Sequence, residues 1–519
     1  MCEFIKKMGG VDAKIFRLIC QCKAVMRRIL FLSLWLCGTP CAAAKNLSLD
    51  EIVQFTIAHN VNVDTAAMLR VLQRYDVAVA ENFFDPKFEF SGQGAWRENE
   101  DHFKNYSQNK ILSVQPGTRL NTKIGTQFQF FWENEAALQN SNGDWTKTFT
   151  TTPSISITQP LLKNFGTTVN TNNLQTSIEQ EAINLLTFKN LLNTQITNSI
   201  NAYYALIQAK EALQIQQDAY KKAVELKKRT EHLIKEGRLA NNEIYEVASQ
   251  VSQQALNISS AKLAVTQARL TLLDQLDLSP QEAKDFDIEN KVYLSSAFPR
   301  AKLAETVTLQ NSVPYQQTLV SIKQSERQLF IAENQNEWAL DLNLSHQLNG
   351  GQSNDGIGNA FHNMGGLDAH ATSATLSFTM PLGNDLARKE QVVSAKVSLL
   401  QNKRSERALQ REIENQVITN LESIKLLKET LKNQEATLAL RRKSADSASL
   451  KYNEGMISSF ELTTVQDTLT AAEQSVIDSK IGLAQSLANF DLTLGTTLDT
   501  WQVQFETQDR RYDAEITDK

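Results

Sequence analysis

Apolar residues recur every seven positions in two stretches of the chain, and the two stretches match each other. One line runs through residues 244–272 and the other through 462–490, and each member of the second lies 218 positions after its counterpart. The five pairs are Ile244/Leu462, Val251/Leu469, Ile258/Val476, Val265/Leu483 and Leu272/Phe490. A sustained seven-residue repeat is typical of helices that pack as coiled coils. The pattern predicts a duplicated chain of long helices.

The same order of elements, namely short helix, strands, long helix, turn and short helix, is written twice. No proline or glycine occurs from Thr167 to Lys235, which predicts a single helix about 100 Å long at roughly 1.5 Å per residue. Its second-copy counterpart is predicted at about 384–453. We expect the short helices at about 49–81, 241–276, 303–334 and 459–494. Two short helices placed end to end match one long helix, as a cylinder wall requires, and a globular helical bundle rarely needs helices of this length.

Polar and apolar residues alternate between the short and long helices of each copy. Alternation at residues 87–90, 123–132, 340–345 and 373–380 predicts four strands with one apolar face. The pattern alone fits a sandwich or a membrane barrel. The strands lack a second sheet and the chain outside its N-terminus lacks about 20 consecutive apolar residues, so we favour a barrel. Residues 97–117 and 140–145 are interpreted as loops with room for an extra hairpin, and the glycine-rich segment 350–366 as an outer loop.

Four strands cannot close a barrel, because roughly eight is the smallest number that does. The chain is therefore expected to assemble. Three copies would form a 12-stranded barrel above a ring of helices, with a water-filled interior lined by Gln, Asn, Ser and Thr.

The N-terminus has the layout of a secretory signal peptide. Arg27 and Arg28 precede the apolar run 29–36, and Ala42–Ala44 suits cleavage after Ala44. The apolar run is too short for a transmembrane anchor, and Met26 is an alternative start. All five cysteines lie in the first 41 residues, so the exported chain is predicted to have no disulfide or thiol chemistry.

Composition then narrows the function. A net charge of −5 argues against a nucleic-acid partner, which needs a concentrated basic face. No catalytic or phosphate-binding motif is present, so no enzyme activity, cofactor or metal is expected; His346, His362 and His370 are interpreted as polar loop residues. The predicted organisation is a signal peptide (1–44), a first repeat (45–279), a linker (280–300), a second repeat (301–495) and a C-terminal tail (496–519).

Two strand-to-helix junctions and two helix turns together carry a family resemblance. The junctions read Thr-Gln-Pro-Leu-Leu-Lys-Asn-Phe-Gly at 158–166 and Phe-Thr-Met-Pro-Leu-Gly at 378–383, and the turns read Glu-Gly-Arg-Leu at 236–239 and Glu-Gly-Met-Ile at 454–457. In this arrangement the sequence resembles the TolC family of outer-membrane efflux and secretion channels, over about residues 47–494. The resemblance implies a homotrimer with a β-barrel in outer-membrane lipid and an α-helical barrel across the periplasm. It also implies docking to a periplasmic adaptor and an inner-membrane pump of the RND, ABC or MFS type.

The two turns are the candidate functional site. Gly237 and Gly455 suit left-handed helix ends, Asn241 and Ser459 suit helix caps, and Ser458 with Glu461 has capping-box spacing. By resemblance, these turns form the periplasmic entrance and dock the adaptor. The implied docking residues are Gly237, Arg238, Leu239, Gly455, Met456, Ile457 and Ser458.

The resemblance also implies an entrance gate. Glu461 matches an acidic residue that rings the entrance in this family. The family has a second ring of acidic residues, and this chain has Thr464 at that position. Glu243 and Glu246 occupy comparable positions in the first repeat. Carboxylates repeated threefold would favour cations. Tyr452 and Glu243 match positions that hold the entrance shut, and the expected basic partner is replaced by Ile457.

Two other function classes stay open at this point. A periplasmic adaptor is also exported and rich in coiled coil, but it has one helical hairpin flanked by β-domains. A trimeric surface adhesin also combines strands and helices, but its barrel strands are not split between two copies. The leading interpretation is a passive channel of a tripartite efflux pump or type I secretion system, whose cargo the sequence does not indicate.

Overall fold

The computed structural model describes residues 45–100, 106–141, 143–281, 286–294, 301–349, 351–365, 369–380 and 386–513. The chain divides into two compact units. The smaller unit contains strands β1 (Lys45–Leu47) and β6 (Phe286–Ile288), which pair in parallel. All further elements belong to the larger unit. The predicted signal peptide lies outside the described residues.

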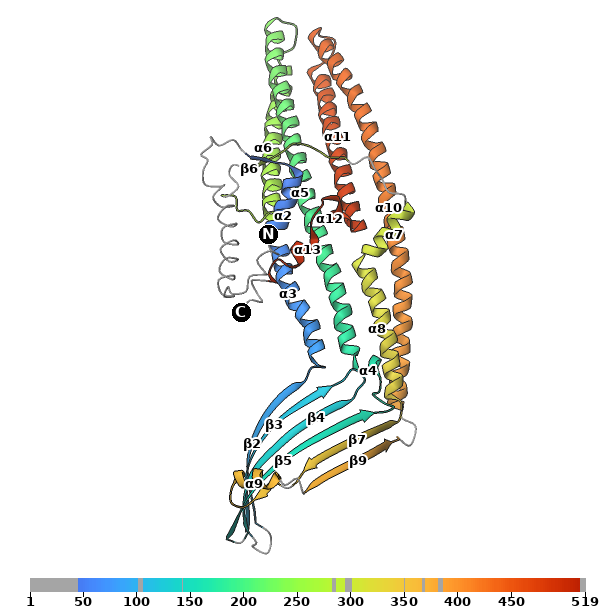
Figure 1. Ribbon diagram of the computed structural model, residues 1–519. Coiled ribbons are helices and arrows are strands. Elements are labelled where there is room, and N and C mark those ends of the chain that lie inside the picture. The colour runs from blue at the N-terminus through green and yellow to red at the C-terminus, as the bar shows by residue number, and fades with distance from the viewer. Residues whose placement is uncertain are drawn as a thin grey trace, which may run out of the picture. The chain divides into compact units, whose positions relative to one another are not determined.

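Four long helices dominate the larger unit (Figure 1). They are α5 (Asn172–Lys235), α6 (Glu243–Gln275), α10 (Leu386–Asn453) and α11 (Ser459–Leu494). The bounds of α11 are as predicted. The expected single helix from Thr167 is wrong at its start, because a one-turn helix, α4 (Thr167–Asn170), is separated from α5 at Thr171.

The two short helices at the start of the repeats are each broken in two, which corrects the prediction of continuous helices. The pieces are α2 (Leu49–His59) and α3 (Val61–Asn82) in the first repeat, and α7 (Ala301–Asn311) and α8 (Val313–Gln335) in the second. Asn60 Oδ1 accepts hydrogen bonds from the N–H groups of Asn62 and Val63, and so caps α3. Ser312 caps α8, where Pro314 stands in the first turn. Polar caps restart the helix at both breaks.

At each break an asparagine side chain also meets the end of another helix. Asn60 Nδ2 donates to the carbonyl of Gln275 at the end of α6, at 2.8 Å. Asn311 Nδ2 donates to the carbonyl of Leu494 at the end of α11, at 2.9 Å. The C-terminal ends of α6 and α11 thus meet the breaks between α2 and α3 and between α7 and α8, respectively.

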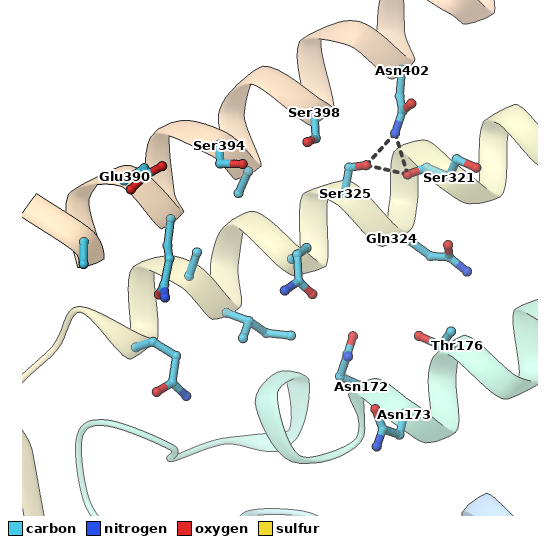
Figure 2. Close-up of a pocket in the computed structure, with 17 residues that line it drawn as sticks. Asn172, Asn173, Thr176, Ser321, Gln324, Ser325, Glu390, Ser394, Ser398 and Asn402 are labelled. Carbon is cyan, nitrogen blue, oxygen red and sulfur yellow. Dashed lines mark hydrogen bonds between the residues drawn. The ribbon is translucent and has the colours of Figure 1, made fainter.

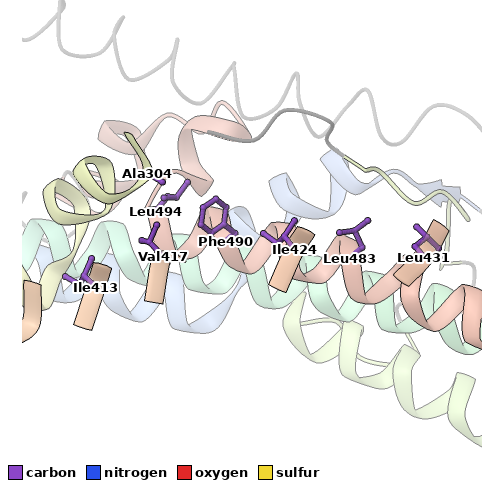
Figure 3. Close-up of a cluster of buried hydrophobic side chains, with 8 residues drawn as sticks. All are labelled: Ala304, Ile413, Val417, Ile424, Leu431, Leu483, Phe490 and Leu494. Carbon is purple, nitrogen blue, oxygen red and sulfur yellow. The ribbon is translucent and has the colours of Figure 1, made fainter. Parts of the chain in front are cut away.

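The heptad positions of the second repeat form a continuous apolar core. Figure 3 shows side chains from α7, α10 and α11 in one row along these helices. Val417, Ile424 and Leu431 of α10 are buried against Leu483 and Phe490 of α11. No helix in the described part of the chain has an apolar stretch long enough to cross a membrane. After α11 the tail folds back as α12 (Thr497–Thr500) and α13 (Phe505–Asp509), and α13 contacts α3 and α5.

The sheet has more strands than predicted. Among the described residues, six antiparallel strands lie in the order β2-β3-β4-β5-β7-β9, with a short β8 (Gly351–Ser353) beside β5 (Figure 1). Their bounds are β2 Lys87–Glu100, β3 Tyr106–Asn121, β4 Gln127–Ser141, β5 Asp144–Pro160, β7 Ala339–Leu348 and β9 His370–Thr379. The expectation of four strands is wrong, because residues 97–117 are mostly strand and form an extra hairpin. The predicted outer loop 350–366 likewise contains β8 and the helix α9 (Ile357–Met364).

The two faces of the sheet differ in chemistry from edge to edge. Directly paired residues share a face, as in the row Thr118–Phe130–Ile155. One face carries exposed apolar side chains, and the other carries mainly hydroxyl, amide and carboxylate groups. Apolar members are Phe88, Phe90, Leu112, Phe128, Phe130, Ile155, Leu344, Leu376 and Phe378; polar members include Gln129, Glu133, Glu135, Thr150, Ser156, Asn343 and Ser377. The predicted one-sided pattern is confirmed.

Candidate functional site

Each long helix ends in a glycine turn at the end of the helices far from the sheet (Figure 1). Gly237 after α5 has φ +72° and Gly455 after α10 has φ +73°, the left-handed conformation that glycine adopts without strain. The next N–H groups reach back over the turn, from Arg238 to the carbonyl of Leu233 and from Met456 to that of Lys451, both at 2.9 Å. These bonds satisfy carbonyls that the helix end would leave unpaired.

The two turns start the following helix differently. Ser458 caps α11 and forms a complete capping box with Glu461, as predicted. The caps predicted at Asn241 and Ser459 are wrong. Helix α6 begins at Glu243 after Asn242, which has helical dihedral angles and no side-chain cap, and Ser459 is the first residue within α11. The first turn is therefore longer, and the α6 N-terminus is left without a side-chain cap.

Glu243 instead caps the helix of the other repeat. Its Oε2 accepts from the backbone N–H of Ser459 at 3.3 Å and from the Ser459 hydroxyl. Ser459 is buried and lies in the first turn of α11. A carboxylate is favourable there because the first N–H groups of a helix carry partial positive charge. The two hairpins, α5–α6 and α10–α11, are thus joined by Glu243.

Tyr452 makes a second link between the hairpins. Its side chain is fully buried, and its hydroxyl oxygen lies 2.7 Å from Thr230 Oγ1 of α5. The Thr230 hydroxyl donates its single proton to the carbonyl of Leu226, so the Tyr452 hydroxyl is the donor of this bond. Burial raises the pKa of Tyr452, and the nearby charge of Glu243 raises it further, whereas the charge of Arg229 opposes the shift.

Apolar side chains from both hairpins surround this bond. We call them the tip cluster: Leu226, Leu233, Val247, Ala448, Tyr452 and Leu462, against which Leu239, Ile457 and Val465 are partly packed. Arg229 donates to Asn453 Oδ1 at 2.7 Å, and Arg238 donates to the Asn453 carbonyl at 3.2 Å. Ile457, where the resemblance leads one to expect a base, contributes to an apolar contact.

The remaining predicted residues face outward. Glu246 and Glu461 are exposed, and Glu461 Oε2 accepts from the Ser458 N–H at 3.3 Å. Met456 and the neighbouring Phe460 expose 72% and 64% of their surface, which is unusual for large apolar side chains. Sequence reasoning missed Thr230, Arg229, Asn453 and the role of Ser459 as a partner. Their contacts join residues more than 200 positions apart, and no local pattern marks them.

A polar groove lies near the sheet, where α5 of the first repeat meets α8 and α10 of the second (Figure 2). Its lining is mostly amide and hydroxyl side chains, with the carboxylate of Glu390. Asn402 Nδ2 spans the groove wall between α10 and α8, and donates to Ser325 Oγ at 2.7 Å. The seam between the repeats is therefore polar at this end and apolar at the tip cluster.

The histidines give no metal site within the described residues, where no group of three or more potential ligands converges. The rings of His346 and His370 lie 5.8 Å apart on paired strands, and His346 Nδ1 lies 2.8 Å from Thr372 Oγ1.

Solved structures of outer-membrane channels share this fold. The Campylobacter jejuni CmeC channel is 14% identical, with a TM-score of 0.63, and the match covers 86% of this chain and 85% of that one. Vibrio cholerae VceC is 11% identical (TM-score 0.65, 86% and 96% covered), and the open state of Neisseria gonorrhoeae MtrE is 13% identical (TM-score 0.63, 88% and 93% covered). No protein-family model and no curated protein matches the sequence. The chain has the TolC-type channel fold that its sequence resembles.

Proposed function

We propose that this protein is a trimeric outer-membrane channel, a passive conduit across the outer membrane and the periplasm. The observation that carries the proposal is the sheet, which exposes one apolar face and one polar face over six strands. A closed barrel of such strands places the apolar face in lipid and the polar face around water. The likeness to CmeC, VceC and MtrE, which are outer-membrane channels, supports the same assignment.

The hairpin ends form the periplasmic entrance in this proposal. The Tyr452–Thr230 and Glu243–Ser459 bonds hold the two hairpins of one chain together and keep the entrance narrow. Glu246 and Glu461, exposed and repeated threefold, make the entrance negative. The exposed Met456 and Phe460 supply apolar surface to a periplasmic adaptor, which in turn recruits an inner-membrane pump.

Fractionation and conductance test the channel role. We expect the protein in the outer-membrane fraction, and we expect the purified trimer to produce single-channel steps in a planar bilayer. Recovery from the soluble periplasm or the inner membrane, or a monomer without conductance, would overturn the proposal.

Thr230→Val and Tyr452→Phe test the entrance contacts, because each removes one side of the same buried hydrogen bond. We expect higher conductance from both variants, and an effect of the double variant no larger than that of either one. Thr266→Val is the matched control, because Thr266 is exposed on α6 and bonds only within its own helix turn. Unchanged conductance in the paired variants would reject a gating role for this bond.

Glu461→Ala and Glu246→Ala test the charge of the entrance. We expect each variant to shift the reversal potential in a salt gradient toward lower cation selectivity. An unaltered reversal potential in both variants would reject the acidic entrance while leaving the channel role intact.

A further inference from the structure

The lateral edges of this chain are open in both its sheet and its helices. Within the described residues, β2 pairs only with β3, and β9 pairs only with β7. The helices nearest the sheet follow the same sequence of neighbours, α3–α5–α8–α10. The end helix α3 leads directly into β2, and β9 leads towards α10. The two open edges of the sheet thus continue into the two end helices.

Each end helix carries an unpartnered apolar stripe with heptad spacing. On α3 the stripe is Met68, Leu72, Tyr75 and Val79, and on α10 it is Leu386, Val393, Val397 and Leu400; all are 46–68% exposed. The edge strands add exposed Phe88 and Phe90 on β2 and exposed Leu376 and Phe378 on β9. Two apolar heptad stripes are complementary surfaces for coiled-coil packing. The occupant that fits both edges at once is a second copy of this chain.

The extra hairpin, β2–β3, is part of the sheet and is anchored at the end of the sheet next to the helices. The turn between β3 and β4 lies against the loop that leads into α4, where the Gly166 N–H donates to the carbonyl of Ile124 at 3.2 Å. Gly125 has φ +99°, and a Cβ there would lie 2.8 Å from the carbonyl oxygen of Asn164. Thr126 is buried, and its hydroxyl donates to Gln159 Oε1. These contacts anchor the β2–β3 hairpin, through the turn that follows it, to the rest of the sheet.

We propose that β9 of one copy pairs with β2 of the next, so that three copies close a barrel of 18 strands. This inference rests on the proposed trimeric channel and sets its strand number. β2 leaves the helix end of the sheet and β9 returns to it, so the new pair is antiparallel like the others. Six strands are too few to close alone, and an open edge in lipid would leave backbone groups without hydrogen-bond partners.

The strand number decides the width of the outer opening. With strands about 4.8 Å apart and tilted by about 40°, 18 strands give a backbone diameter of about 36 Å, against about 24 Å for 12. A barrel of this width would hold a wide aqueous channel, so the main resistance to flow would lie at the helical entrance.

Cysteine cross-linking across the new seam tests the proposal. All five native cysteines precede residue 45, so the described chain offers a cysteine-free background. Cysteine at Leu376 or Phe378 is combined with cysteine at Phe88 or Phe90, and membranes are treated with a short bismaleimide. We expect linked dimers and trimers on denaturing gels. The pair Leu120→Cys with Phe128→Cys lies directly opposite within one chain and is the control that should link without forming dimers.

The competing arrangement excludes the extra hairpin from the wall and joins β9 to β4 in a 12-stranded barrel. Its signature is linkage of Leu376→Cys or Phe378→Cys to Phe128→Cys or Phe130→Cys of another copy, and that result overturns the 18-strand proposal. Electron microscopy of the unmodified trimer is a second test. We expect it to show 18 strands, and a barrel of 12 strands would contradict the proposal. Conducting trimers with β9–β4 links would leave the channel role intact, whereas a monomer without conductance would overturn both proposals.

Discussion

Helices α6 and α11 occupy equivalent places in the two repeats, yet they are buried differently. Leu263 of α6 and Ile481 of α11 lie 218 residues apart and in the same register, but Leu263 is 58% exposed and Ile481 is 1% exposed. Tyr245 and Thr463 are an equivalent pair and differ in the same direction, at 76% and 6%. The heptad pattern alone does not distinguish the two helices.

The difference comes from the number of neighbours. α11 packs against α10 of its own hairpin and also against α5 of the first repeat, whereas α6 packs mainly against α5. As a result α6 keeps a second apolar stripe, Leu256, Leu263 and Leu270, exposed at seven-residue spacing. An unburied heptad stripe on a long helix is typical of a surface that packs against another helix. The exposed stripe on α6 therefore marks the side of the first repeat that a neighbouring copy would cover.

The largest expected effect is a difference in stability between variants of Ile481 and Leu263. Ile481→Ala deletes fully buried methyl groups, and we expect it to lower the free energy of unfolding by about 2–5 kcal/mol. Leu263→Ala should change the stability of the single chain by about 0.5 kcal/mol or less, but should raise the fraction of monomer. Urea titrations in detergent and native gels measure the two quantities. Equal destabilisation of the single chain by both variants would contradict the difference in burial between Ile481 and Leu263.

A second asymmetry lies between α3 and α8. Arg70 of α3 is buried, whereas the equivalent position 252 residues later is the apolar Ile322. Arg70 Nε donates to Asp509 Oδ1 of the C-terminal tail at 2.8 Å, and Arg70 Nη1 donates to Glu181 Oε2 of α5 at 2.9 Å. The tail therefore stabilises α3, whereas on α8 the arginine that pairs with a carboxylate of α5 is Arg327, with Glu179.

Removing the Arg70 guanidinium should cost less than the Ile481 cavity. Arg70→Ala removes the cation that faces Glu181 and leaves Asp509 paired with Arg74. We expect a loss of about 2–3 kcal/mol, below the full cost of breaking a buried pair because Glu181 keeps some exposure. Arg74→Ala is the control, since Arg74 pairs with the same tail at a more exposed site and should cost about 1 kcal/mol or less. If the two variants lose the same stability, Arg70 has no special role in holding the tail.

Local signals account for the parts of the fold that were predicted. The bounds of α11 follow from Gly455, from the capping box of Ser458 with Glu461, and from an unbroken heptad. The breaks at Asn60 and Ser312 also had a signal, because both are good caps and Pro314 follows the second. They were missed because the apolar pattern runs through them.

Long-range contacts account for the parts that were not predicted. Pro116 and Gly117 argue locally against the strand that β3 forms at this point. In the structure the ring of Phe131 on β4 covers Gly117 so closely that no Cβ fits there, a pairing that only the assembled sheet reveals. The Tyr452–Thr230 and Glu243–Ser459 bonds are likewise unpredictable from local sequence, since their members are 222 and 216 residues apart.

The smallest expected effect concerns an ionisable group that only the second repeat has. Tyr452 stands where the first repeat has Ile234, and its pKa is raised by burial above the ordinary value near 10. Its neutral form is favoured in the folded state, so its contribution to stability is complete below about pH 10 and is lost as the pH rises from there through the raised pKa. We expect the melting temperature of the wild type to fall more steeply above about pH 10 than that of Tyr452→Phe. We also expect the variant to lack the part of the tyrosinate absorbance that develops at a pH above the ordinary tyrosine pKa. Ile234→Ala, at the equivalent position, should lower the melting temperature by the same amount at every pH. Parallel pH profiles for the wild type and Tyr452→Phe would mean that the phenol titrates normally, and that the tip cluster does not exclude water from it.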